Sequence, residues 1–143
     1  PQGARPSANR TTEEVLYSIA DAYVAQGYAF SNSGHMEIML AGYDVYQNPD
    51  ARIVRSLVRF DIADLPSGQE ITEATLKWYV LGSYDDRQSS RTIRAYRATA
   101  PWSEDGVSWA YMPGYGEEYA SKSIPHAIEF WVEFEVADLV RAL

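Results

Sequence analysis

The sequence contains no cysteine, and its 143 residues include only 12 lysines and arginines against 20 acidic residues. Without cysteine, the chain forms no disulfide and offers neither a thiol nucleophile nor a zinc–thiolate site. A net charge of -8 argues against nucleic acid as a partner, since phosphates attract basic patches. No apolar run approaches the roughly 18–20 residues that cross a bilayer, so no membrane insertion is expected.

Recognisable catalytic motifs are also missing. The chain has two histidines, His35 and His126, and neither lies in a G-x-S-x-G or H-E-x-x-H pattern. There is no phosphate-binding glycine motif, and the spacing of the acidic residues singles out no pair for glycosidase chemistry. The sequence therefore predicts a protein that is not an enzyme and has no catalytic residue.

What the sequence has is a high aromatic content, with eleven tyrosines and four tryptophans, and a period-two alternation of apolar residues. The alternation is clearest in residues 127–136, where one face carries Ile128, Phe130, Val132, Phe134 and Val136. The expected strands span residues 15–20, 22–25, 37–43, 52–62, 71–81, 92–98 and 127–136. Many short strands with one long apolar face predict an all-β, antiparallel β-sandwich. Residues 137–143 are expected to form a short helical turn.

The amino-terminal residues differ in composition from the rest. Residues 1–14 are polar, contain two prolines and predict an extended arm, whereas residues 15–143 predict one β-sandwich domain. Asn9 begins an Asn-Arg-Thr triplet with the form of an N-glycosylation sequon.

Aromatic residues are the candidates for ligand binding, because flat rings provide platforms for sugar rings. Tyr79 and Trp131 lie on the outward faces of expected strands, and Tyr111, Tyr115 and Tyr119 lie in a glycine-rich aromatic stretch. For Trp102 and Trp109 we favour the alternative role, which is to fill the core. The guanidinium groups of Arg55, Arg59 and Arg94 can hold a uronate carboxylate, although ion pairs with Asp61 or glutamates are the competing use.

Aspartates in and beside expected loops suggest calcium as a candidate cation, because carboxylates and carbonyls suit it. Asp21 and Asp61 are the candidate ligands. No EF-hand spacing is present, so this prediction rests on composition alone.

Several blocks, taken together in order, resemble the DNRLRE-domain family. They are residues 20–24 (ADAYV), 55–62 (RSLVRFDI), 65–68 (LPSG), 71–80 (ITEATLKWYV), 96–99 (YRAT), 101–104 (PWSE), 107–109 (VSW) and 132–140 (VEFEVADLV). The resemblance covers roughly residues 20–141. It implies a bacterial or archaeal jelly-roll sandwich, extracellular or on the cell surface, that is non-catalytic and grouped with carbohydrate-binding modules, some of which bind alginate. It also implies that Arg59 and Asp61 form a buried or semi-buried pair.

Members of that family continue past the block that ends at Val140, whereas this sequence stops at Leu143. A sandwich lacking closing strands exposes an apolar groove, which a strand from a neighbouring copy can fill. This reasoning predicts a head-to-tail homo-oligomer, a filament built by strand donation. Its expected interface residues are Val15, Leu16, Tyr17 and Ile19. The alternative function is a carbohydrate-binding module that recognises an extracellular, acidic polysaccharide.

Overall fold

A computed structural model describes residues 12–44, 50, 52–66, 68–82 and 91–143. Almost all regular structure in these residues is β, which confirms the predicted all-β sandwich. The strands are β1 (Ser18–Ala25), β2 (Gly42–Asp44), β3 (Arg52–Phe60), β4 (Thr75–Val80), β5 (Arg91–Ala98), β6 (Tyr115–Ile124) and β7 (Phe130–Glu135). Two 3-10 turns, η2 (Gln26–Tyr28) and η4 (Ile62–Asp64), and one helix, α1 (Ala137–Ala142), complete the described elements. None of these helices is long and apolar enough to cross a membrane.

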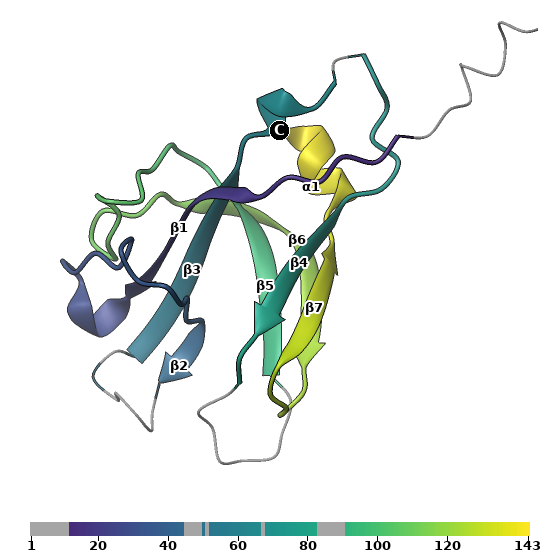
Figure 1. Cartoon of the computed structure of the whole chain (residues 1–143). Helices are drawn as coiled ribbons and strands as arrows, with labels where there is room; N and C mark the ends of the chain where they lie inside the picture. Colours follow the sequence, from purple (N-terminus) through teal and green to yellow (C-terminus); the bar gives the residue numbers. More distant parts are fainter. Residues whose placement is uncertain (1–11, 45–49, 51, 67, 83–90) are drawn as a thin grey trace, which may run out of the picture.

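The strands form three antiparallel sheets, in the orders β1–β3–β2, β4–β7 and β5–β6. Figure 1 shows the β1–β3–β2 sheet on one side of the molecule and the β4–β7 pair on the other, with β5 and β6 behind. One face of the β4–β7 pair packs into the core, and alternate residues of both strands leave its other face exposed.

The largest core cluster lies where the β4–β7 pair packs against β5 and β6. Val132, Phe134 and Val136 are buried there. Their partners are Ala74, Leu76, Trp78, Val80, Ile93, Ala120, Ile124, Phe130, Leu139 and Val140. Alternate residues of a strand point to opposite faces, so this inward set forces the residues between them outward. Burying a side chain as large as phenylalanine contributes about 1.5–3 kcal/mol.

A second cluster covers the β1–β3 sheet. Ala22, Val24 and Val107 are fully buried. Leu57, Trp102, Trp109 and Met112 pack against them, as predicted for the two tryptophans. Residues 99–114 therefore cover this face of β3, and we call them the lid segment. Leu57 lies on the same face of β3 as Arg55 and Arg59, and this segment packs against it.

Several predicted boundaries need correction. β6 was missed, because YGEEYASKSI has no apolar alternation and most of the strand is exposed. Ile128 was expected in the core but is 72% exposed, since Glu129 has a φ of 55° and interrupts the extended backbone before β7. Residues 12–17 form no strand, and β1 runs on as one strand from Ser18. The predicted arm lies outside the described residues as far as residue 11, and so does Asn9.

Candidate functional site

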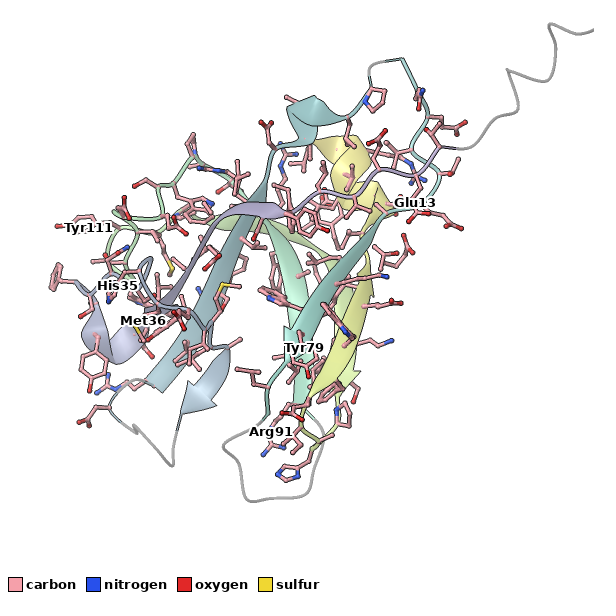
Figure 2. All side chains as sticks on the ribbon, in the orientation of Figure 1. Glu13, His35, Met36, Tyr79, Arg91 and Tyr111 are labelled. Carbon is pink, nitrogen blue, oxygen red and sulfur yellow. The ribbon has the colours of Figure 1, made fainter. Side chains whose placement is uncertain are left out.

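Tyr79 and Trp131 form an exposed aromatic pair on the outer face of the β4–β7 sheet. They are direct partners in the strand register, and their ring centroids lie 5.2 Å apart with an edge-to-face angle of 65°. Trp131 is 65% exposed and Tyr79 is 44% exposed. Their positions follow from the alternation, because the neighbours Trp78 and Val132 belong to the core. Figure 2 shows Tyr79 on β4, at a distance from Tyr111 and His35.

A groove of about 340 Å³ lies between β6 and β7, and Trp131 is part of its lining. We call it the β6–β7 groove, and it is lined by Lys122, Ser123, Pro125, Phe130, Trp131, Val132 and Glu133. Among the described strands β7 pairs only with β4, so its other edge has no strand partner. The volume is near the lower end of the roughly 300–1,000 Å³ typical of small-molecule sites.

The charges in this groove are few. Glu133 Oε1 lies 3.5 Å from Lys77 Nζ, and both side chains are more than half exposed. No carboxylate of the described residues forms an ion pair with Lys122. The groove therefore combines an aromatic wall with one ammonium donor, one carboxylate acceptor and the Ser123 hydroxyl. This combination suits an uncharged, hydroxyl-rich ligand.

Tyr115 belongs to a second aromatic group, at the start of β6. Its ring centroid lies 4.9 Å from that of Tyr96. The Arg55 guanidinium carbon lies 5.1 Å from the Tyr115 ring and 4.9 Å from the Trp109 ring, which is cation–π geometry. Among the described residues, Arg55 makes no ion pair, whereas Arg94 pairs with Glu118 at 2.8 Å.

Tyr111 pairs with a residue that sequence reasoning missed. Phe30 and Tyr111 are 78% and 72% exposed, and their ring centroids lie 6.1 Å apart. The segments are joined next to the rings, where Ala110 N donates to Ala29 O at 2.8 Å. The fifth predicted aromatic residue, Tyr119, is only half exposed and lies at a β-bulge opposite Ala95 and Tyr96.

The candidate calcium ligands lie in β1 and just after β3. Asp61 follows β3, and its carboxylate accepts from Ala63 N at the start of η4. Asp21 lies within β1, opposite Val58. In the described part of the chain, no group of three or more acidic or histidine side chains could hold a metal ion.

The pair of Arg59 and Asp61 that the family resemblance implies is wrong. Both residues are exposed, and no ion pair joins them. Arg59 Nη1 instead donates to Trp102 O at 2.7 Å, and the Arg59 guanidinium carbon lies 5.4 Å from the Trp102 ring. Arg59 thus fastens the lid segment of residues 99–114 to β3.

The predicted interface residues lie around the beginning of β1. Val15, Tyr17 and Ile19 are exposed, and Leu16 is half-buried. Ile19 is the bulged residue where the register of β1 against β3 shifts. These residues form an apolar strip on the surface.

Two partners were therefore missed, Phe30 and Tyr96. Phe30 lies far from Tyr111 in sequence, and no alternation around it indicates its neighbour. Tyr96 lies in an expected strand, but its partner Tyr115 is in β6, which was not predicted. Exposed ring pairs beside a small groove on an all-β sandwich are typical of the class of proteins that bind carbohydrates.

Comparison with known families agrees with that class. The chain belongs to carbohydrate-binding module family 96, whose model matches residues 12–143. No curated protein matches the sequence. The family match supports the predicted grouping with carbohydrate-binding modules, whereas the name DNRLRE is not confirmed. Modules of this kind are typically non-catalytic and usually extracellular or attached to the cell surface.

Proposed function

We propose that this chain binds an extracellular polysaccharide, with Tyr79 and Trp131 as its platform and the β6–β7 groove beside them. The observation that carries the proposal is the register pairing of two exposed rings next to a groove, in a chain of a carbohydrate-binding family. The family match favours this function over the filament that the sequence first suggested.

The physical basis is the stacking of a sugar ring on an aromatic side chain. The C–H faces of a sugar ring are apolar, and they stack on the face or edge of an exposed aromatic ring. The sheet fixes the backbone of both residues, and each ring has only two side-chain torsions to restrict on binding. Hydroxyls beside the stacked ring then meet Lys122 as a donor and Glu133 as an acceptor. A sugar unit held in this way has a defined orientation along the groove.

The test is affinity-gel electrophoresis of the purified chain in native gels. The gels contain hydroxyethylcellulose, arabinoxylan, galactomannan, polygalacturonate or alginate. Wild-type protein is expected to be retarded by at least one of them, and Trp131→Ala is expected to be retarded clearly less than the wild type. Leu143→Ala is the control, because Leu143 is an exposed apolar residue outside the β-strands. A wild-type chain that no gel retards contradicts the proposal.

Preference for an acidic polysaccharide is a finer part of the proposal, and it rests on Arg55. The Arg55 guanidinium lies near two aromatic rings and is free of carboxylate partners among the described residues. Its planar N–H groups suit a carboxylate held by two parallel hydrogen bonds. The net charge of -8 opposes a polyanion, so such binding depends on this local site and weakens as salt is raised.

The chain is proposed to act without catalysis and outside the cell. Incubating the retarding polysaccharide with the chain is expected to release no new reducing ends and no unsaturated products. Strand donation between copies stays a prediction that rests on the exposed Val15, Tyr17 and Ile19. Sedimentation velocity of the wild type and of Tyr17→Asp tests it, because a filament predicts large species that the variant loses.

A further inference from the structure

A second small hollow lies at the turn that carries Phe30. We call it the Tyr28 hollow, and its volume is about 270 Å³. It is lined by Tyr23, Ala25, Tyr28, Ser31, Asn32, Ser33, His35 and Met36. The residues on either side of Phe30 are bound in one turn, in which Ser31 N donates to Tyr28 O at 3.0 Å. Phe30 therefore lies in the turn between two lining residues, and it is 78% exposed.

The walls of the Tyr28 hollow are held in place by hydrogen bonds. Asn32 Nδ2 donates to Glu104 O at 2.7 Å and to Val107 O at 2.8 Å. Ser33 is buried, and its hydroxyl bonds to both the backbone N–H and the carbonyl of Tyr23. These contacts join three segments that are distant in sequence. A wall fixed in this way loses little conformational freedom when it binds a ligand.

Close packing fixes the same loop. A Cβ atom on Gly34 would lie 2.1 Å from Glu104 O, so only glycine fits there. The loop is thereby pressed against the segment that carries Tyr111. Figure 2 places Tyr111, His35 and Met36 at one end of the molecule, away from Tyr79. The Tyr28 hollow is thus separate from the β6–β7 groove.

The chemistry of the Tyr28 hollow defines its ligand. Its described lining contains no carboxylate, lysine or arginine. It offers the hydroxyl of Ser31, the imidazole of His35 and the thioether of Met36, all three on exposed residues. Phe30, in the turn beside it, pairs with Tyr111, and both residues are highly exposed. Apolar rings combined with a few uncharged hydrogen-bonding groups suit a neutral sugar unit.

We propose that Phe30, Tyr111 and the Tyr28 hollow form a second carbohydrate site, which takes a neutral sugar unit of a polysaccharide. The chain then has two separate sites and links two polysaccharide segments. This inference rests on the proposed function, because it assigns a second site to the same activity. Two sites on one rigid module raise the affinity for a long chain above that of either site alone.

The experiment uses amide chemical shifts of the isotope-labelled full chain. The probes are the neutral polysaccharide that retards the wild type most in the gels and its hexasaccharide. The hexasaccharide is expected to shift two groups of amides, one around residues 79 and 131 and one around residues 29–36 and 110–112. Trp131→Ala should abolish the first group of shifts only, and Tyr111→Ala the second only. Phe30→Leu provides a second variant that keeps an apolar side chain at the turn.

The turbidity of a solution of the polysaccharide gives an independent readout. The wild type is expected to make its solution turbid by crosslinking chains, and either single variant should abolish the turbidity while retaining some gel retardation. Leu143→Ala, at an exposed apolar residue outside both sites, should behave as the wild type in both assays.

The outcomes separate the two proposals. A wild type that binds, with shifts confined to residues near 79 and 131, overturns the second site and leaves the proposed function standing. Shifts near residues 29–36 that depend on protein concentration and not on the hexasaccharide identify self-association instead, and also overturn it. No retardation and no shifts in the wild type contradict the proposed function itself.

Discussion

Tyr79 and Trp131 face each other across β4 and β7, with ring centroids 5.2 Å apart, and each is the direct cross-strand partner of the other. Aromatic pairs of this geometry contribute about 0.5–1.5 kcal/mol beyond the area that they bury. Both rings are nevertheless substantially exposed, so much of their apolar surface stays in contact with water. The pair is therefore already ordered before a sugar arrives, and its exposed surface is available for binding.

The two faces of β7 should respond differently to mutation. Phe134 is buried, and Phe134→Ala is expected to lower the free energy of unfolding by about 3–5 kcal/mol. Trp131→Ala, on the exposed face of the same strand, should leave stability within about 1.5 kcal/mol of the wild type, the upper value for an aromatic pair. Urea denaturation followed by circular dichroism measures both. Equal losses of stability would show that Trp131 supports the fold and is not a free platform.

Lys122 should contribute to binding through its ammonium donor in the groove. Lys122→Gln is expected to weaken polysaccharide binding about tenfold, which corresponds to about 1.4 kcal/mol. Lys77→Gln is the comparison, because Lys77 forms an exposed ion pair with Glu133 that is worth at most about 1 kcal/mol. Isothermal titration with the retarding polysaccharide gives both affinities. A larger loss for Lys77→Gln than for Lys122→Gln would place the ligand away from the groove.

Arg55 should matter for acidic polysaccharides only. Arg55→Lys keeps the charge but loses the planar fork, so binding to polygalacturonate is expected to fall severalfold. Binding to a neutral polysaccharide should stay unchanged. Affinity gels at low and raised salt measure the difference, and the wild-type retardation by polygalacturonate should itself decrease with salt. A parallel loss on both kinds of polymer would assign Arg55 to packing against Trp109 and Tyr115.

Asn32 should stabilise the loop that forms the Tyr28 hollow. Asn32→Asp keeps the shape of the side chain but removes the two donors to Glu104 O and Val107 O. Leaving these part-buried carbonyls opposite a carboxylate is expected to cost about 1–3 kcal/mol of unfolding free energy. Thermal and urea denaturation check the size of the loss.

Gly34→Ala should lower the free energy of unfolding by about 1–3 kcal/mol as well, since a Cβ atom overlaps Glu104 O. Wild-type stability in either variant would contradict this account of the loop.

Period-two alternation predicted the fold class and the strands that carry a core face, β3, β4 and β7 among them. It also placed Tyr79 and Trp131 outward, because their neighbours alternate into the core. It could not pair them, because the register of β4 against β7 depends on the packing of both strands. β6 has little burial and so no alternation to detect. The pairing of Phe30 with Tyr111 depends on a contact between two segments that are far apart in the sequence, and no local sequence pattern indicates it.

The measurement that tests the central claim most directly is the affinity of the wild type and of Trp131→Ala for one polysaccharide. The polymer that retards the wild type in native gels is used, with circular dichroism to establish that both proteins are folded. We expect Trp131→Ala to bind at least tenfold more weakly, and Leu143→Ala to bind as the wild type does. A folded Trp131→Ala that binds as tightly as the wild type would contradict the claim that Tyr79 and Trp131 form the platform.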